Sequence, residues 1–237
     1  MNRREILERL RGGLIVSCQA LEGEPLHGPA FMAAMARAAE MGGAVGIRAN
    51  SPEDIQAIKT VCSLPLIGLY KRTYPNSDIY ITPTMREVRA VVDAGAEIVA
   101  IDATQRPRPD GLTLEELVRQ IRAESEVLIV GDVSTYEEGL AAARAGVDIV
   151  STTLSGYTPY SRQGPTADLE LVARLAADLP VPVIAEGRIW TPEEARKALE
   201  AGAFAVVVGT AITRPQEIVR RFVQALSGPD RHQRARA

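Results

Sequence analysis

The sequence predicts an α/β protein folded as one closed barrel of eight parallel strands. Three observations predict this fold class. Short apolar runs alternate with stretches of helical period along the whole chain, eight such runs can be placed, and glycines recur where a helix gives way to a strand. Strand–helix alternation is typical of a parallel sheet, and eight units can close it into a single (β/α)8 TIM barrel. The length of 237 residues suits one domain of this kind.

The apolar runs are rich in Val and Ile and show little polar alternation, as expected for strands covered on both faces. They occupy residues 14–18, 44–48, 66–70, 98–102, 127–133, 149–153, 183–186 and 205–209. An open, doubly wound sheet is the alternative arrangement. No Gly-x-Gly-x-x-Gly follows the first run, which argues against a dinucleotide-binding sheet of that type.

Helix start signals lie between these runs. Ser51-Pro52 and Thr191-Pro192 each place a capping residue before a proline at the first helical position. Thr-x-x-Glu at 113–116 and at 135–138 fits the capping box. Residues 1–12 are predicted to form a short amphipathic helix that closes the bottom of the barrel.

Helix stop signals are equally regular. Ala-Gly at 94–95, 145–146 and 201–202 places a glycine where a helix ends and the next strand begins. The barrel is predicted to extend over residues 1–226. The polar, basic segment 227–237 is expected to be a flexible tail, and its His232 is expected to have no chemical role.

Composition excludes several classes of protein. A net charge of −3 gives no electrostatic reason to expect nucleic acid or membrane partners, and 4% aromatic residues provide no set of stacking platforms for bases. No apolar run approaches the roughly 20 residues that span a bilayer, and the N-terminus lacks the apolar core of a secretory signal. Cys18 and Cys62 are expected to be buried, reduced thiols, so the cytoplasm is the expected compartment.

Charged and polar residues end most of the apolar runs. Active sites of barrels form at the carboxyl ends of the strands, so these side chains are expected to converge on one mouth. A ring of charges around a partly desolvated pocket is typical of a functional site. The residues at the run ends include Gln19, Arg48, Lys71, Asp102, Asp132 and Glu186.

The last two units predict a phosphate site. Gly187 and Gly209 follow the seventh and eighth runs, where glycine lets backbone N–H groups approach an anion. Arg214 adds a guanidinium suited to phosphate, and barrels place phosphate repeatedly at these two loops.

Lys71 is the candidate base. It ends an apolar run, with Arg48 and Arg72 nearby in strand order, and both burial and positive neighbours lower the pKa of an amine. Arg72 is predicted to face away as a rim charge. Glu186 is the matching acid candidate and would oppose the lowering of the pKa. A structural Lys71–Glu186 ion pair and a Schiff-base role for Lys71 remain as alternatives.

A metal site is not expected, because His27 and His232 do not end strands beside paired carboxylates. Serine and cysteine nucleophiles lack a histidine partner.

The segments that end the runs together resemble the N-acetylmannosamine-6-phosphate 2-epimerase family (NanE), from about Gly13 to Leu226. The resemblance lies in Leu-Ile-Val-Ser-Cys-Gln-Ala at 14–20, Gly-Ile-Arg-Ala at 46–49, Ile-Gly-Leu-Tyr-Lys-Arg at 67–72, Ala-Ile-Asp-Ala-Thr at 100–104, Thr-Thr-Leu-Ser-Gly-Tyr-Thr at 152–158, Ile-Ala-Glu-Gly-Arg at 184–188 and Val-Gly-Thr-Ala-Ile-Thr-Arg-Pro at 208–215.

The resemblance implies a (β/α)8 enzyme that interconverts N-acetylmannosamine 6-phosphate and N-acetylglucosamine 6-phosphate in sialic acid breakdown, without metal, nucleotide or other cofactor. It implies catalytic roles for Lys71 and Glu186. The residues that it implies hold the substrate are Gln19, Arg48, Asp132 and Arg214, with backbone contacts to phosphate from Gly187, Arg188, Gly209 and Thr210.

Two other functions remain as alternatives. One is another isomerase or epimerase acting on a phosphorylated substrate, although the pentose-phosphate type requires metal-binding histidines that are missing here. The other is a non-catalytic sugar-phosphate sensor, against which the presence of both Lys71 and Glu186 argues. A homodimer formed through outer helices is plausible for a barrel.

Overall fold

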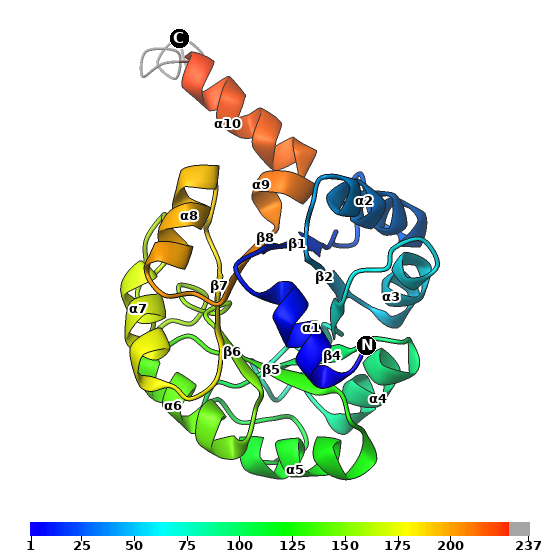
Figure 1. Ribbon diagram of the computed structural model, residues 1–237, viewed down its shortest axis with the longest axis vertical. Helices are drawn as coiled ribbons and strands as arrows, with labels where there is room; N and C mark the ends of the chain where they lie inside the picture. Colours follow the sequence, from blue (N-terminus) through cyan, green and yellow to red (C-terminus); the bar gives the residue numbers. More distant parts are fainter. Residues whose placement is uncertain (228–237) are drawn as a thin grey trace.

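The computed structural model describes residues 1–227 and confirms the predicted (β/α)8 barrel. Eight parallel strands close in sequence order, with β1 also paired to β8, and helices surround them (Figure 1). The strands are β1 (Leu14–Cys18), β2 (Gly46–Asn50), β3 (Leu66–Leu69), β4 (Ile98–Asp102), β5 (Leu128–Asp132), β6 (Ile149–Ser151), β7 (Val183–Glu186) and β8 (Ala205–Val208).

The helices begin and end largely at the predicted signals. The side chains of Ser51, Thr113, Thr135 and Thr191 each accept a hydrogen bond from a backbone N–H of the first turn. The helices are α1 (Arg3–Leu10), α2 (Pro29–Met41), α3 (Pro52–Lys59), α4 (Met85–Asp93), α5 (Leu114–Glu124), α6 (Tyr136–Ala145), α7 (Leu169–Asp178), α8 (Pro192–Glu200), α9 (Thr210–Thr213) and α10 (Pro215–Ser227).

The second strand lies two residues later than predicted. The run at 44–48 is apolar from its start, but Gly46 is the first residue with a ladder partner, Ile15, and pairing continues to Asn50. Apolar composition alone does not mark where the strand begins. Ala44 and Val45 are apolar although they precede the strand, because they lead into it beside the end of α2. The shift places Asn50 at the carboxyl end of β2.

Each strand separates two cores. Alternate residues such as Ile15, Ile67 and Val130 fill the barrel interior, while Val16 and Ile47 face the helices. Side chains of a strand point alternately to its two faces, so the inward series continues into polar residues in six of the eight strands. These are Ser17 in β1, Arg48 in β2, Asp102 in β4, Asp132 in β5, Ser151 in β6 and Glu186 in β7.

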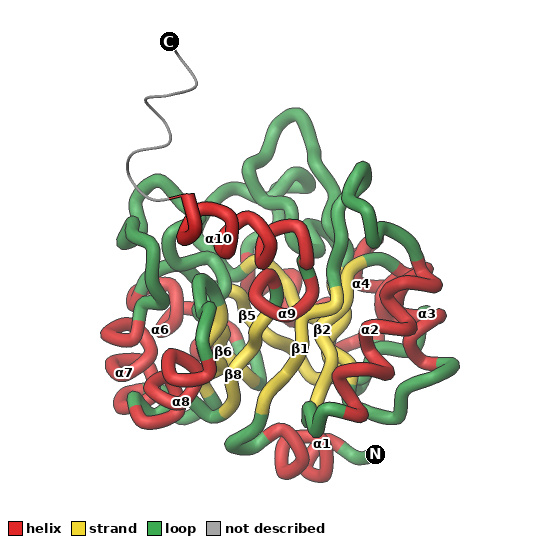
Figure 2. Tube along the Cα trace, turned by 90° about the horizontal axis from the view of Figure 1, so that it is seen from above, coloured by secondary structure: helices red, strands yellow, loops and turns green. Residues whose placement is uncertain are grey.

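Helix α1 closes the bottom of the barrel, as predicted. Ile6 and Leu10 are buried in the interior cluster, and Figure 2 shows α1 at one end of the barrel with long loops at the other. Gly46 makes this closure possible, because a Cβ there would lie 2.6 Å from a methyl group of Leu10. The bottom is therefore filled, and the open end is the one that receives the polar residues.

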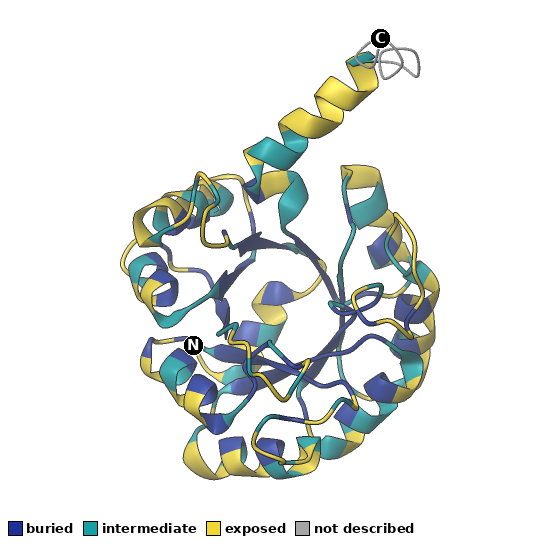
Figure 3. Cartoon of the chain, turned by 180° about the vertical axis from the view of Figure 1, so that it is seen from behind, coloured by how far each residue is buried: buried dark blue, intermediate teal, exposed yellow. Residues whose placement is uncertain are grey.

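Helix α10 projects from the barrel wall, and none of its residues is buried (Figures 1 and 3). Ser227, which was expected to begin the tail, is the last residue of this helix; the rest of the expected tail, with His232, lies outside the described residues. Within residues 1–227, no helix is both long and apolar enough to cross a membrane.

Candidate active site

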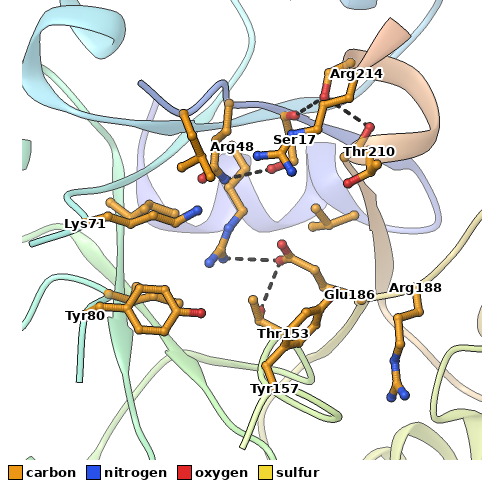
Figure 4. Close-up of a pocket in the computed structure, with 18 of the residues that line it drawn as sticks. Ser17, Arg48, Lys71, Tyr80, Thr153, Tyr157, Glu186, Arg188, Thr210 and Arg214 are labelled. Carbon is orange, nitrogen blue, oxygen red and sulfur yellow. Dashed lines mark hydrogen bonds and ion pairs between the residues drawn. The ribbon is translucent and has the colours of Figure 1, made fainter. Parts of the chain in front are cut away.

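A pocket of about 620 Å³ opens at the carboxyl ends of the strands. Figure 4 shows the side chains of Lys71, Tyr80, Arg48 and Glu186 converging on it from different parts of the barrel. Of the residues selected from the sequence, those that line the pocket are Gln19, Arg48, Lys71, Glu186, Gly187, Arg188, Gly209, Thr210 and Arg214. Asp102 and Asp132 are the exceptions, since both are fully buried and neither lines the pocket.

Lys71 follows β3 and is held by its backbone. Its N–H donates to Asn50 Oδ1 at 2.8 Å, and Lys71 also forms an isolated antiparallel bridge with Ile81. Burial, and then the positive charge of Arg48, lower the pKa of the Lys71 amine to about 8. The neutral amine is therefore much more available near neutral pH than in an ordinary lysine.

The titration of Lys71 is directly measurable because the chain has three lysines, the others being Lys59 and Lys197. After reductive methylation with ¹³C-formaldehyde, the Lys71 signal is expected to titrate with a midpoint near pH 8, protonated below and neutral above. Lys71→Arg assigns the signal by its loss. A midpoint near the reference value of about 10.4 would contradict the placement of Lys71 in a desolvated, positive environment.

Arg48 and Asp132 form a buried ion pair beneath the pocket. Their side chains are 1% and 0% exposed, and the guanidinium contacts Asp132 twice, with Nη2–Oδ2 at 2.5 Å and Nη1–Oδ1 at 3.2 Å. The same Nη1 lies 3.3 Å from Glu186 Oε2. Asp132 therefore acts on the pocket by fixing Arg48, rather than by lining it as the sequence suggested.

Glu186 ends β7 and is held at both its main chain and its side chain. The Thr152 hydroxyl accepts from Glu186 N–H and donates to Glu186 C=O, each at 3.1 Å, and the Thr153 hydroxyl lies 3.1 Å from Oε2. Burial raises the pKa of Glu186, although Arg48 opposes this. The pocket therefore contains an amine with a lowered pKa and a carboxyl with a raised pKa.

The alternative of a structural Lys71–Glu186 ion pair is not the contact that forms, because the carboxyl of Glu186 contacts Arg48. Figure 4 shows Lys71 and Glu186 on opposite sides of the pocket, with Arg48 between them. A titratable group thus stands on each side of the space that a ligand would occupy.

Gly187 and Gly209 bring backbone to the rim of the pocket. Gly187 has φ +105°, which glycine adopts readily. A Cβ on Gly209 would lie 3.2 Å from Ser17 Cβ, so the backbone passes close to β1. Arg214 lines the same part of the pocket, and its Nε lies 3.3 Å from Glu24.

The side chain of Arg188 turns away from the pocket centre (Figure 4). Its guanidinium donates to Gly164 C=O at 2.6 Å and to Ser155 Oγ at 3.4 Å. Gly156 lies directly beneath, where a Cβ would sit 2.6 Å from the guanidinium carbon. A contact from Arg188 to a ligand in the pocket would thus come from its backbone.

Sequence reasoning missed several pocket residues. Tyr80 reaches the pocket because the long β3–α4 loop folds back, with Arg72 N–H donating to Tyr80 C=O at 3.0 Å. Tyr157 and Trp190 also come from loops. Thr153 had a detectable signal, since it continues the inward series of β6 after Ser151. Arg72, predicted to face away, is exposed but lines the mouth.

Comparisons with known proteins agree on one family. A family model described as "Putative N-acetylmannosamine-6-phosphate epimerase" (NanE) matches residues 32–228. Proteins named "Putative N-acetylmannosamine-6-phosphate 2-epimerase" from Caldanaerobacter subterraneus subsp. tengcongensis and Clostridioides difficile are 61% and 53% identical to this chain. The alignments cover 92% of this chain and 93% of the first protein, and 93% of this chain and 99% of the second.

Solved structures agree with the sequences. The N-acetylmannosamine-6-phosphate 2-epimerase from Clostridium perfringens superposes with a TM-score of 0.92 at 51% identity, covering 95% of this chain and 98% of that one. Thiamine phosphate pyrophosphorylase from Pyrococcus furiosus, at 18% identity and a TM-score of 0.60, shares the fold alone. From the match over residues 32–228 and the high identity along nearly its whole length, the chain belongs to the N-acetylmannosamine-6-phosphate epimerase family.

Proposed function

We propose that this protein interconverts N-acetylmannosamine 6-phosphate and N-acetylglucosamine 6-phosphate, in the degradation of sialic acids and related amino sugars. The observation that best supports this is the pairing of Lys71 and Glu186 across one pocket, with opposite pKa shifts. Groups whose environments push their pKa values toward neutrality suit proton transfer at neutral pH. The names of the relatives support this choice of substrate.

The chemistry is proton transfer at carbon two. That proton is acidic only when carbon one is an open-chain aldehyde, so the ring must open first, and Glu186 is placed to exchange a proton with the ring oxygen or the carbon-one hydroxyl. The neutral amine of Lys71 then takes the carbon-two proton, and the electron pair moves to the carbonyl oxygen as an enolate. Arg48, held by Asp132, supplies positive charge for that oxygen.

The phosphate binds at the other end of the pocket. Backbone N–H groups of the Gly187–Arg188 and Gly209–Thr210 segments, together with the Arg214 guanidinium, form the anion site in this proposal. Gln19 lines the same pocket and contacts substrate oxygens or the acetamido group. Holding phosphate far from carbon two fixes the sugar and lets remote binding energy orient the reacting end.

Turnover in heavy water tests the proposal. N-acetylmannosamine 6-phosphate is incubated with the protein and followed by proton NMR, and both the second epimer and deuterium at carbon two are expected. Product without deuterium would argue against a solvent-exchanging base. Absence of turnover with this sugar, but a stable borohydride-trapped adduct at Lys71, would favour the Schiff-base alternative.

We also propose that the protein is a homodimer that uses α10. Val219, Phe222, Val223 and Leu226 are each more than half exposed and follow helical spacing along one side of this helix. A projecting helix gains most of its stability by burying such a face, and a second copy of the chain provides an equivalent face by symmetry.

Phe222→Asp is expected to convert the dimer to monomer, because it places a charge in the middle of the apolar face. Sedimentation velocity at micromolar concentration measures the change. Gln224→Asp is the matched control, since it adds the same charge at an exposed position outside the set of apolar residues. A monomeric wild-type protein, or equal effects of the two variants, would contradict this assignment.

A further inference from the structure

The Thr153 hydroxyl lies among three oxygen atoms but has one proton. Asp132 Oδ1 is 2.6 Å away, Ser151 Oγ is 2.8 Å away and Glu186 Oε2 is 3.1 Å away. Each of these contacts is favourable when a proton lies on the line between the two oxygens. A count of the protons available for these three contacts therefore indicates whether the Glu186 carboxyl is protonated.

The Thr153 proton is assigned to Asp132. This contact has the length of a charge-assisted O–H···O⁻ bond, about 2.5–2.7 Å, and Asp132 also accepts two bonds from the Arg48 guanidinium. Without the proton, two buried oxygens would face each other at 2.6 Å with no hydrogen between them. The Ser151 hydroxyl, buried beside Thr153, donates its own proton to Thr153.

The contact between Thr153 and Glu186 Oε2 then has no proton from threonine. An ionised Glu186 has none either, so Oε2 would face a lone pair of Thr153 inside the barrel. Arg48 Nη1 lies 3.3 Å from this oxygen but makes its hydrogen bond to Asp132 Oδ1. The conflict disappears when Glu186 is a carboxylic acid whose O–H donates to Thr153 Oγ1. The raised pKa of Glu186, caused chiefly by burial, agrees with this arrangement.

We propose that Thr153 is a positioning residue that accepts the proton of Glu186 and thereby keeps this side chain as the acid of the reaction. The proposal rests on the proposed function for its reaction step, but its protonation state concerns the protein without substrate. Thr153 touches both carboxyl groups and is neither the base nor the acid itself.

The reaction then uses two groups on two faces. The neutral Lys71 amine removes the proton from carbon two, the C–H electron pair forms the enolate, and Lys71 becomes an ammonium. The O–H bond of Glu186, which lies across the pocket from Lys71 (Figure 4), breaks as a new C–H bond forms on the opposite face of carbon two, and the enolate returns to the aldehyde. Proton transfer from the Lys71 ammonium to the Glu186 carboxylate, through solvent, restores the starting state.

Infrared difference spectra of the substrate-free protein test the protonation state. Subtracting the spectrum of Glu186→Gln from that of wild type isolates the carboxylic acid C=O band of Glu186, which is expected to be present at pH 7 and to disappear as pH rises. An absent band at pH 7 would overturn the proposal. Because no substrate is used, this result is independent of whether the protein is an epimerase.

Thr153→Val is expected to shift the pKa of Glu186, and the sign of the shift distinguishes the two hydrogen-bond arrangements. If Thr153 accepts the proton of Glu186, its loss removes a partner of the acid form, and the pKa of Glu186 falls by about one pH unit. If Thr153 instead donates to a Glu186 carboxylate, the pKa rises. A rise, or no shift, would therefore overturn the proposal.

Two matched variants distinguish the loss of the Thr153–Glu186 hydrogen bond from a general loosening of the structure around Glu186. Thr153→Ser keeps the hydroxyl and is expected to retain the wild-type titration midpoint. Thr152→Val removes the neighbouring hydroxyl, which bonds only the main chain of Glu186, and is expected to leave the midpoint in place. A shift in Thr152→Val equal to that in Thr153→Val would show a structural effect and overturn the assignment.

Activity provides a second readout. Thr153→Val is expected to lower kcat about tenfold with little change in KM, while Thr153→Ser stays within about threefold of wild type. If the infrared shift is as expected but wild type does not turn over the sugar, the proposed function fails while the hydrogen-bond assignment stands. Unchanged kcat in Thr153→Val of an active enzyme would overturn the positioning role.

Discussion

Replacing Lys71 with alanine is expected to lower kcat by about 10²–10⁴-fold, because a general base of this kind contributes about that factor. The amine is the group in the pocket whose pKa, about 8, leaves a useful neutral fraction near pH 7. Arg48 remains protonated, and its guanidinium is already bound to Asp132. Initial rates of epimerisation measured by NMR, with thermal unfolding as a check on folding, provide the test.

Folding of this variant is expected to be intact, and the sign of the pKa shift explains why. The folded-state pKa of Lys71 lies below the 10.5 of an unperturbed lysine, so the unfolded chain binds more protons between pH 8 and about 10.5. Stability therefore rises with pH through that window, and below it the buried ammonium destabilises the fold. For that reason, replacing Lys71 with alanine is not expected to lower Tm at pH 7.

Lys197→Ala is the matched control, since Lys197 is exposed on α8, away from the pocket. It is expected to keep wild-type activity. Near-normal turnover in Lys71→Ala would remove Lys71 from the mechanism, whereas loss of activity with a large fall in Tm would show that Lys71 is needed for the fold instead.

Replacing Glu186 with glutamine is expected to lower epimerisation by about 10²–10⁴-fold, while exchange of the carbon-two proton falls only by the smaller factor that Glu186 contributes to ring opening. Glutamine keeps the shape of the side chain and can contact Arg48 and Thr153, but it has no acidic proton to deliver. Lys71 can still remove the carbon-two proton and return a solvent deuteron to the same face. Deuterium should therefore enter the starting sugar without inversion.

Glu186→Asp is the control for the length of the side chain, because it retains the carboxyl group but shortens the side chain by one methylene. It is expected to recover part of the epimerisation rate. If Glu186→Gln loses exchange and epimerisation equally, Glu186 acts before carbon-two chemistry, in ring opening, and a role on the second face is contradicted.

Much of the fold and part of the site could be predicted from sequence because the relevant signals are local. A Thr-x-x-Glu sequence caps a helix through bonds three residues apart, as at 113–116, and the apolar runs report burial directly. Barrel geometry then places the ends of all strands at one mouth, so Lys71 and Glu186 could be selected although 115 residues separate them.

Contacts that depend on register and loop path could not be predicted in this way. Asp132 was expected to contact substrate, but packing places its carboxylate under the pocket, bound to Arg48. Tyr80 has no sequence signal, since it reaches the pocket through a loop that folds back on Lys71. Thr153 became significant only when its distances to two carboxyl groups were known.

The amino-acid sequence by itself determined the number and order of the strands and most of the polar groups at the open end, since period, caps and burial are encoded in neighbouring residues. Only the tertiary structure decided which of those groups pair with one another. Pairing depends on distances of a few tenths of an ångström between strands remote in sequence. Those distances are what the proposed assignment of Lys71 as base and Glu186 as acid rests on.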